Sequence, residues 1–291
     1  MKSVTITLLG GLGNQMFQYA IGRALSIRLG LPLVLDLSML RLRTDAYIAR
    51  DYELGCFRLS GQRVRDLPVW LARAGTNVSR WLVSQGISSV QHIQERGVQF
   101  QPEVLEVRGA CRLEGYWQSE CYFAPVSKQL RADFTILPAP DPRSVECAAR
   151  IRDVASVGLH VRRGDYLTHP NCAAFHSVCP KDYYDAALQH VLERLGPAVE
   201  LFVFSDDMEW TRENIRYPLP TTYVDWNATC GYEDLRLMSA CRALIMANST
   251  FSWWGGWLNP RPDRLVIAPR QWFQAPGYVS ELPNSPWVIA L

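Results

Sequence analysis

Two adjacent arginines, Arg162 and Arg163, follow the apolar run at residues 157–159. Each guanidinium presents a rigid fork of donors that matches the oxygens of a phosphate or a carboxylate. An isolated pair of arginines is more often a solvated surface cluster. Here His160 comes before the pair and a Gly-Asp dipeptide follows it, at the point where a strand opens into a loop. Because open α/β sheets bind ligands at the carboxyl ends of their strands, this stretch predicts an anion site.

Further polar clusters follow other apolar runs in the second half of the chain. They are Asp206-Asp207, Asp225 and Asn248-Ser249-Thr250. If the strands are parallel, these clusters share one edge of the sheet with the arginines. Residues 248–250 come just before a helix, where their hydroxyl and backbone N–H groups can donate hydrogen bonds to an oxyanion. Together these groups would hold a pyrophosphate. The two adjacent aspartates could bind a base or ribose, or a divalent metal, or they could be a helix cap followed by a solvated acid.

Strands and helices are expected to alternate after the proline-rich segment 138–142, which predicts a linker. The expected helices are about 143–152, 181–195, 232–241 and 251–258, with another before residue 223, and the expected strands are 157–161, 199–204, 223–224, 243–246 and 265–268. This alternation predicts a parallel sheet wrapped in helices. The aromatic residues within 251–258 are expected to pack between domains or onto the sheet.

The N-terminal residues predict a strand, a helix and a second strand. Residues 4–9 alternate and then run apolar, and residues 31–35 form the next expected strand, which ends at Asp36. Between them, Asn14 is expected to cap a helix that stops at Gly30. These elements form a βαβ unit.

The glycine-rich turn at residues 10–13 suggests a dinucleotide site at first sight. Met16 stands where the third glycine of that fingerprint belongs, which disfavours a nicotinamide enzyme. Gly11 and Gly13 still remove side chains where a nucleotide or sugar could approach closely. Asn14 would then lie at a helix N-terminus, a place that suits anions and hydroxyl groups.

The pattern between residues 40 and 113 is weaker. Residues 68–85 show apolar side chains at helical spacing, and Trp70 and Trp81 within them are expected to belong to the core. Residues 104–116 predict a strand. The following loop, residues 115–120, gathers aromatic and hydrogen-bonding groups and is either a wall for a sugar acceptor or a structural loop.

Composition indicates a soluble globular protein, with 48% hydrophobic and 20% charged residues. The net charge of +2, without a long basic run, argues against a nucleic-acid surface. The eight cysteines form no CxxC pair and are expected to be reduced thiols, several of them buried. Neither a signal-peptide cleavage site nor a membrane-spanning run is present, so we expect a cytoplasmic enzyme with at most a peripheral contact to the inner face of the cell membrane.

Four motifs together resemble the bacterial members of glycosyltransferase family eleven, which are α-1,2-fucosyltransferases. The motifs are Gly10 to Tyr19, His160 to Tyr166, Phe204 to Asp207, and Asp234-Leu235 through Ser249 to Trp254. The resemblance covers most of the chain, to about Leu258. The arginine motif also resembles that of α-1,6- and protein O-fucosyltransferases, which share a GDP-fucose donor and a GT-B fold.

The resemblance implies an α/β protein of GT-B type, with two Rossmann-like domains facing each other across a cleft. Residues 1–140 would form the acceptor-side domain and residues 141–291 the GDP-fucose-binding domain. The implied reaction moves L-fucose from GDP-β-L-fucose, with inversion and without a metal or other cofactor, to the 2-hydroxyl of a terminal galactose. The implied partners are this donor and a galactose-ended oligosaccharide, and no nucleic acid.

The resemblance also implies roles for individual residues. Arg162 would stabilise the charge on the departing GDP, and Arg163 would assist it or lock the loop. Asn14 would lie near the phosphate and the glycosidic oxygen. The remaining implied donor contacts are His160 and Asp206 at the guanine or ribose, Ser249, Thr250 and Ser252 at the phosphates, and Gly11 and Gly13 where the backbone approaches the ligand.

The catalytic base stays open. Inversion needs a group that takes the proton of the acceptor hydroxyl, ordinarily Asp, Glu or His. Asp165 and His169 are the nearest candidates, Asp165 could instead only orient Arg162, and Asp36 is a third. The α-1,6 relatives carry a glutamate shortly after their motif, but residues 170–172 contain no acid, so that role is not transferred.

Two other functions compete with this one. The chain could be a transferase that uses another nucleotide sugar or forms an α-1,3 linkage, or it could be a noncatalytic module that binds sugar nucleotides. Degraded motifs would be expected of the module, whereas Arg162 and Asn14 are intact.

Overall fold

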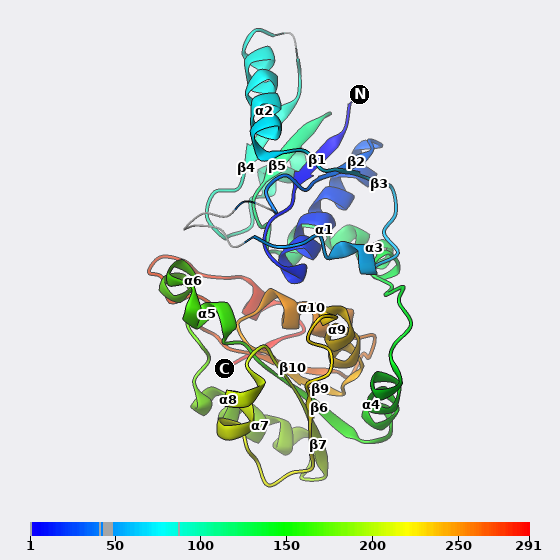
Figure 1. Ribbon diagram of the computed structural model, residues 1–291, viewed down its shortest axis with the longest axis vertical. Coiled ribbons are helices and arrows are strands. Elements are labelled where there is room, and N and C mark those ends of the chain that lie inside the picture. The colour runs from blue at the N-terminus through cyan, green and yellow to red at the C-terminus, as the bar shows by residue number, and fades with distance from the viewer. Residues whose placement is uncertain (1, 41, 43–48, 87) are drawn as a thin grey trace. The chain divides into compact units, whose positions relative to one another are not determined.

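The computed structural model describes residues 2–40, 42, 49–86 and 88–291. The chain divides into two compact units, Met1–Leu137 and Pro138–Leu291 (Figure 1). The division falls at the start of the proline-rich segment 138–142. Each unit is built on its own parallel sheet, as the alternating pattern predicts.

The N-terminal unit contains a five-stranded sheet in the order β3-β2-β1-β5-β4, with every neighbouring pair parallel. Its strands are β1 (Val4–Thr7), β2 (Leu33–Asp36), β3 (Gln62–Arg65), β4 (Gln91–Gln94) and β5 (Cys111–Glu114). Its helices are α1 (Leu12–Leu29), α2 (Val69–Ser84) and α3 (Ser127–Asp133), with short 3-10 turns at 54–56, 102–106, 120–122 and 124–126. The predicted strand at 104–116 is therefore only β5, preceded by a 3-10 turn.

The two faces of this sheet differ in polarity because side chains alternate along a strand. Val4, Ile6 and Leu33 are fully buried on the face that packs against α1. A β-carbon at Gly22 of α1 would lie 2.8 Å from Leu33 Cδ1, so glycine lets this helix approach the sheet. The opposite face carries polar side chains, among them Thr5, and it lies beneath α2.

Helix α1 begins earlier than the sequence predicts. Gly11 is its N-cap and Leu12 its first residue, so the prediction that Asn14 caps the helix is wrong. Gly10 has a φ of 76°, and a β-carbon there would lie 2.4 Å from Asn14 Nδ2, so glycine is required at that position on both counts. At the other end, Gly30 forms the left-handed C-cap as predicted.

The C-terminal unit contains a six-stranded parallel sheet in the order β11-β10-β9-β6-β7-β8. Its strands are β6 (Ala155–Val161), β7 (Val199–Ser205), β8 (Thr221–Val224), β9 (Ala243–Ile245), β10 (Leu265–Ala268) and β11 (Ile289–Ala290). Its helices are α4 (Pro142–Asp153), α5 (Gly164–Thr168), α6 (Pro170–Phe175), α7 (Lys181–Leu195), α8 (Met208–Asn214), α9 (Gly231–Ala240) and α10 (Thr250–Leu258).

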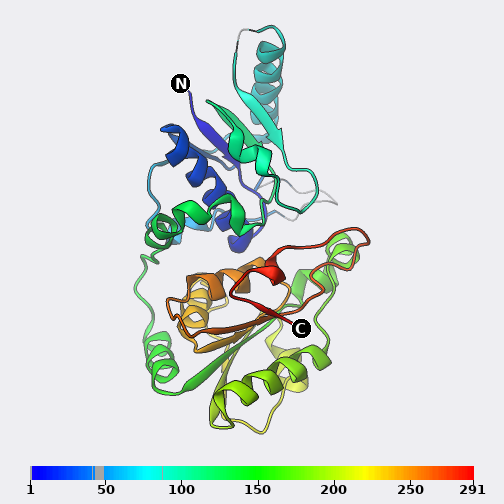
Figure 2. The ribbon, with the colours of Figure 1, turned by 180° about the vertical axis from the view of Figure 1, so that it is seen from behind.

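Helices cover both faces of this sheet (Figures 1 and 2). Helix α7 packs on one face, where Val157, Leu201 and Ile245 join its apolar side in one buried cluster. Helices α9 and α10 pack against each other, and Gly255 of α10 lies against Met238 of α9 and Leu244 of the sheet. The tryptophans of α10 are buried within this unit, as expected for packing residues; they are Trp253, Trp254 and Trp257.

The prediction that Trp70 and Trp81 belong to the core is wrong. Their relative exposures are 71% and 57%, although the predicted helix itself is confirmed as α2. The physical reason is that both side chains lie on the face of α2 opposite the buried Ala72, while the sheet face beneath the helix is polar. Among the described residues, no helix is both long enough and apolar enough to cross a bilayer.

Candidate active site

Arg162 lies at the carboxyl edge of the C-terminal sheet, directly after β6 and between the ends of its neighbours β9 and β7. Its Nη2 lies 2.6 Å from Asp165 Oδ1, and its Nη1 lies 3.1 Å from Asp206 Oδ2. Burial alone would lower the pKa of Arg162, but the charges of Asp206 and Asp165 outweigh it and raise that pKa. The guanidinium is therefore a fixed, permanently charged group whose orientation is set by two carboxylates.

Arg163 fastens the same loop to β7. Its backbone N–H donates to Asp206 Oδ1 at 2.9 Å, and its Nε donates to Asp207 Oδ2 at 3.1 Å. Its guanidinium lies over the Trp210 ring, 3.6 Å from the ring centroid. Asp207 also caps α8 by accepting from the Trp210 N–H at 3.2 Å. These contacts support the loop-locking role of Arg163, and they make Asp207, the second of the two aspartates, the helix cap.

Gly164 allows the segment after β6 to lie close to Asp206, which follows β7. A β-carbon at Gly164 would lie 2.4 Å from Asp206 Oδ2, which is closer than real contacts allow. Both carboxylate oxygens of Asp206 therefore contact residues 162–169, the segment after β6 that we call the arginine loop. If Asp206 binds guanine or ribose as predicted, it does so while it also contacts Arg162 and Arg163.

The end of β9 is tied to the arginine loop from the other side. Tyr166 Oη donates to the Asn248 carbonyl at 3.0 Å. The Asn248 amide in turn donates to the carbonyls of Ser177 at 2.7 Å and Trp272 at 3.0 Å. Asn248 is therefore a structural residue that joins three segments. Ser249 follows it as the N-cap of α10, so the positive end of that helix lies at the sheet edge.

Thr250 and Ser252 occupy different positions in the first turn of α10. Thr250 is the first helical residue and is half-buried. Ser252 is fully buried, and its Oγ lies 3.2 Å from the Ser249 carbonyl and 3.4 Å from that of Ala247. The Ser252 hydroxyl therefore hydrogen-bonds within the first turn of α10, and it is not expected to contact a phosphate.

Replacement of Ser252 with alanine is accordingly expected to leave kcat for the reaction that the resemblance implies within about twofold of the wild-type value. The lost hydrogen bond should lower the free energy of unfolding by about 1 kcal/mol. Steady-state kinetics and chemical denaturation of the same preparation measure both quantities. A tenfold or larger loss of kcat in a stable variant would place the hydroxyl back at the substrate.

His160 lies inside the C-terminal unit at the end of β6, and its ring centroid is 5.8 Å from that of Phe251. Only 4% of the residue is exposed. Burial, followed by the charge of Arg162, lowers the pKa of His160 to about 3. The imidazole is therefore neutral at physiological pH, and its buried Nδ1 has no hydrogen-bond partner among the described residues.

This buried histidine makes stability depend on pH. Its folded pKa lies below the ordinary value of 6.5, so its contribution is complete above about pH 6.5 and is lost as the pH falls from there toward 3. Between about pH 7 and pH 5, His160→Gln should lose about 2 kcal/mol less stability than the wild type. Urea denaturation at the two pH values measures this difference. Parallel losses in the two proteins would contradict the assignment.

The arginine loop contains two of the predicted base candidates and brings a third group to them. Asp165 accepts from Arg162, which supports the orienting role, whereas His169 is half-buried at the start of α6. The additional group is His176, whose ring stacks on Tyr166 with the centroids 4.4 Å apart. Burial lowers the pKa of His176 to about 4, while Asp165 raises it and Arg162 lowers it. The sequence carried no signal for His176, because the short helices α5 and α6 bring it to the loop.

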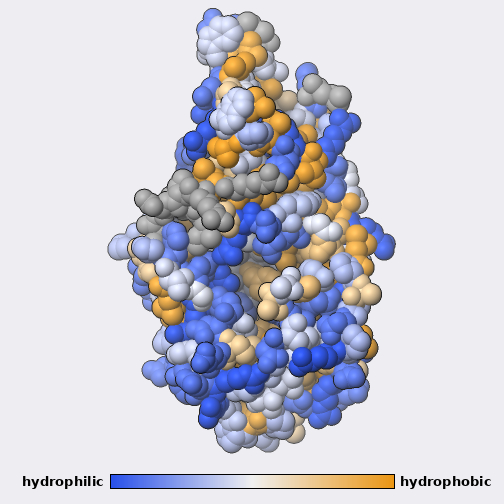
Figure 3. Space-filling model, viewed as in Figure 1, coloured by the Kyte–Doolittle hydropathy of each residue, from blue (hydrophilic) through white to orange (hydrophobic). Residues whose placement is uncertain are grey.

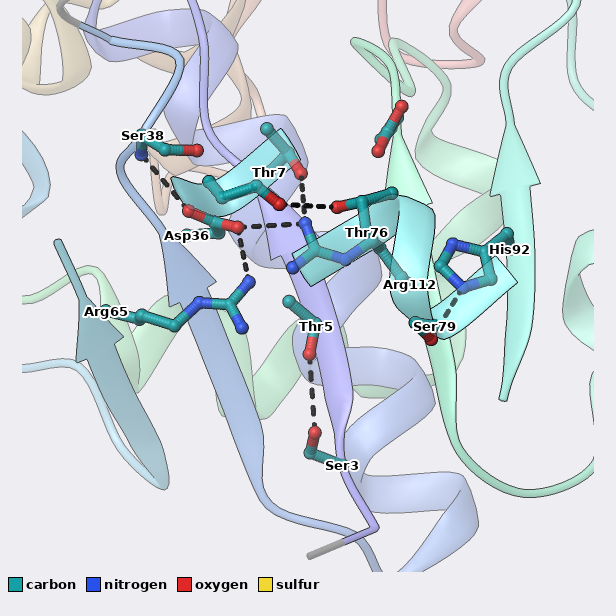
Figure 4. Close-up of polar contacts among 12 residues, drawn as sticks. Ser3, Thr5, Thr7, Asp36, Ser38, Arg65, Thr76, Ser79, His92 and Arg112 are labelled. Carbon is teal, nitrogen blue, oxygen red and sulfur yellow. Dashed lines mark hydrogen bonds and ion pairs between the residues drawn. The ribbon is translucent and has the colours of Figure 1, made fainter. Parts of the chain in front are cut away.

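Asp36, the third predicted candidate, is occupied elsewhere. It is fully buried, and its Oδ2 lies 2.8 Å from Arg112 Nη1 and also contacts Arg65 (Figure 4). Its Oδ1 accepts from the Ser38 N–H at 3.1 Å. A fully buried carboxylate that is paired with two arginines is closed to a substrate hydroxyl, so Asp36 is not placed to act as the base.

In the N-terminal unit, Asn14 lies in the first turn of α1 with its Oδ1 3.1 Å from Gln118 Nε2. Gln118 belongs to the loop 115–120 that the sequence marked as a possible acceptor wall. Within the same motif, Gln15 Nε2 donates to the Gly10 carbonyl at 2.9 Å and to the Asp51 carbonyl at 2.8 Å. The loop 115–120 is thus partly structural. The glycine-rich turn is fixed to α1 by the hydrogen bond from Gln15 to the Gly10 carbonyl.

Two of the predicted glycines differ in their surroundings. Gly11, the N-cap, has Glu53 Oε1 3.7 Å from the place of a β-carbon, so a side chain there would meet only ordinary contact. Gly13 is the second residue of α1 and is buried. Within the described ranges, no group of three or more His, Cys, Asp or Glu side chains is placed to hold a metal ion.

The two units, each with helices around a parallel sheet, and the charged cluster at the carboxyl edge of the second sheet are features of the GT-B fold. The solved NodZ α-1,6-fucosyltransferase soaked with GDP-fucose has the same fold, with a TM-score of 0.51 and 12% identity. That match covers 89% of this chain and 94% of the other.

The chain belongs to Glycosyl transferase family 11, which its residues 106–284 match. An α-1,2-colitosyltransferase of Escherichia coli is 32% identical over 94% of this chain and 93% of its own length. The rabbit (Oryctolagus cuniculus) galactoside α-(1,2)-fucosyltransferase 2 is 28% identical, over 88% of this chain and 66% of its own length. The family and fold implied by the sequence motifs are thus confirmed.

Proposed function

We propose that this glycosyltransferase moves L-fucose from GDP-β-L-fucose to the 2-hydroxyl of a terminal galactose, with inversion to an α-1,2 linkage. The observation that carries the proposal is the position of Arg162, held by Asp165 and Asp206 at the carboxyl edge of the second sheet. Family membership and the α-1,2 relatives described above support the linkage.

The chemistry of the reaction explains why a fixed arginine is needed. As the bond to fucose breaks, the sugar becomes cationic and negative charge grows on the β-phosphate of GDP. A guanidinium has five N–H donors, and the two carboxylates of the site engage one nitrogen each, so Arg162 can also donate to phosphate oxygens. Because the carboxylates fix the guanidinium beforehand, little reorganisation is needed when the charge develops.

The other residues expected to bind GDP-fucose lie mainly at the same carboxyl edge of the second sheet. The positive end of α10, with Ser249 and Thr250, is expected to bind the phosphates, and His160 and Asp206 are expected to lie nearest the nucleoside. Asn14 of the N-terminal unit is expected to act near the glycosidic oxygen. His169 stays a candidate base.

We infer that the reaction needs no metal ion, because Arg162 and the N-terminus of α10 can supply the positive charge. Transfer assayed after exhaustive treatment with EDTA should run at the untreated rate. Loss of activity that added Mg²⁺ or Mn²⁺ restores would overturn this inference.

A second donor deserves a direct comparison because one relative is an α-1,2-colitosyltransferase. The purified chain should be given GDP-fucose and GDP-colitose separately, with the same panel of galactose-ended oligosaccharides. We expect a higher kcat/KM for GDP-fucose. Turnover of GDP-colitose alone would replace the donor in the proposal, and GDP binding without turnover of either donor would indicate a noncatalytic module.

A further inference from the structure

Helix α2 contacts its own sheet sparingly. Of its 16 residues only Ala72 and Thr76 are buried. The sheet face beneath it is polar, as Figure 4 shows, and a cavity of about 200 Å³ lies between the two. The contact includes a hydrogen bond between Ser79 Oγ and His92 Nε2 at 3.0 Å. Several apolar side chains of α2 are therefore available for something other than packing on this sheet.

Those apolar side chains form a stripe on the opposite side of the helix, which we call the outer stripe. It consists of Trp70, Ala74, Val78 and Trp81, whose spacing of four, four and three residues keeps them on one helix face. All four are exposed, and the face is turned away from the buried Ala72. Figure 3 shows apolar side chains at the surface over the part of the molecule that α2 occupies in Figure 1.

The charges around the outer stripe are mainly positive. Helix α2 carries the exposed Arg73 and Arg80 and no acidic residue. Arg80 lies 4.0 Å from Glu114 at the sheet, and the edge strand β3 adds the exposed Arg63. Asp66 is the only acid between the start of β3 and the end of α2.

We propose that the outer stripe of α2 docks this protein onto an anionic lipid bilayer surface. Exposed tryptophans on one face of a helix, flanked by arginines and without acids, match the interfacial region, where indole rings lie at headgroup level and cations meet lipid phosphates. A second copy of the chain is a poorer occupant, because a twofold contact through this helix would bring Arg73 and Arg80 of both copies together. The proposal goes beyond the transfer reaction and does not depend on it.

Vesicle co-sedimentation tests the proposal on the intact 291-residue chain. The probes are vesicles of equal parts phosphatidylglycerol and phosphatidylcholine, and vesicles of phosphatidylcholine alone. The wild type should bind the anionic vesicles about tenfold or more tightly than the neutral ones, since each arginine near the surface contributes about 1 kcal/mol. The preference should weaken in high salt.

Two variants separate the contributions. Trp70→Gln/Trp81→Gln should lower binding to both kinds of vesicle by about tenfold or more, because it removes the apolar insertion. Arg73→Gln/Arg80→Gln should remove most of the preference for anionic lipid. The matched control, Leu137→Ser/Val279→Ser, changes similarly exposed apolar residues outside α2 and should bind like the wild type.

Unchanged binding by the tryptophan variant, or an equal loss in the control, would overturn the proposal. So would a wild-type dimer in gel filtration that the tryptophan variant dissociates, because the stripe would then be an interface between copies. Circular dichroism and transfer to a soluble acceptor check that the variants are folded. A failure of vesicle binding with normal transfer would leave the proposed reaction untouched.

Discussion

Replacement of Arg162 with alanine is expected to lower kcat by about 100-fold or more, because transition-state charge stabilisation of this kind is worth roughly 3 kcal/mol. The variant loses the group that would meet the negative charge growing on the departing GDP. Asp165 and Asp206 would also lose their shared partner. Stopped assays of GDP release at saturating GDP-fucose and acceptor measure the effect.

Two further variants make this expectation specific. Arg162→Lys keeps one positive charge but cannot contact both carboxylates in the same geometry, so it should recover only part of the lost activity. Arg150→Ala removes an arginine of the same unit that pairs with Glu200 away from the loop, and it should leave kcat near the wild-type value. Near-normal turnover by a folded Arg162→Ala variant would refute the mechanism.

The second large effect is expected from Asp36→Asn. The change leaves Arg65 and Arg112 without the carboxylate that they share in the N-terminal unit. Breaking a buried ion pair by removing one partner costs about 3–5 kcal/mol, and the partial exposure of Arg65 places the expected loss near the lower end. Chemical denaturation monitored by circular dichroism measures the change.

The control for this prediction is Glu103→Gln in the same unit. Glu103 pairs with Arg96 at the surface, so its replacement should change the stability by no more than about 0.5 kcal/mol. The Asp36 variant also tests whether Asp36 acts as the catalytic base. If it proved as stable as the wild type but inactive, Asp36 would act on the substrate and the structural account of it would be wrong.

The regular part of the fold was predictable because apolar periodicity alone determines it. Helix α7 and strand β10 begin and end where the pattern places them. The edge strands β3 and β4 were missed, since Gln-Arg-Val-Arg and Gln-His-Ile-Gln carry almost no apolar signal and become strands only by pairing with buried neighbours. Their pairing is a tertiary effect that local pattern does not contain.

The sequence was sufficient to predict which strand ends carry the residues of the candidate site. Parallel strands place their polar termini at one edge, which is why Arg162, Asp206 and Ser249 could be grouped from sequence. Which of these side chains contact one another could not be predicted, because the contacts depend on side-chain geometry. His176 reaches the loop only through two short helices, and Trp70 is exposed because it lies on the face of α2 opposite the buried Ala72.

The most direct test of the central claim is the structure of the product formed from GDP-β-L-fucose and a galactose-ended oligosaccharide. Nuclear magnetic resonance of the purified product gives the anomeric configuration and the position of the new bond together. The account predicts an α-linked fucose on the 2-hydroxyl of the terminal galactose. A β-linked product, a fucose on another hydroxyl, or the absence of transfer to any galactose-ended acceptor would contradict it.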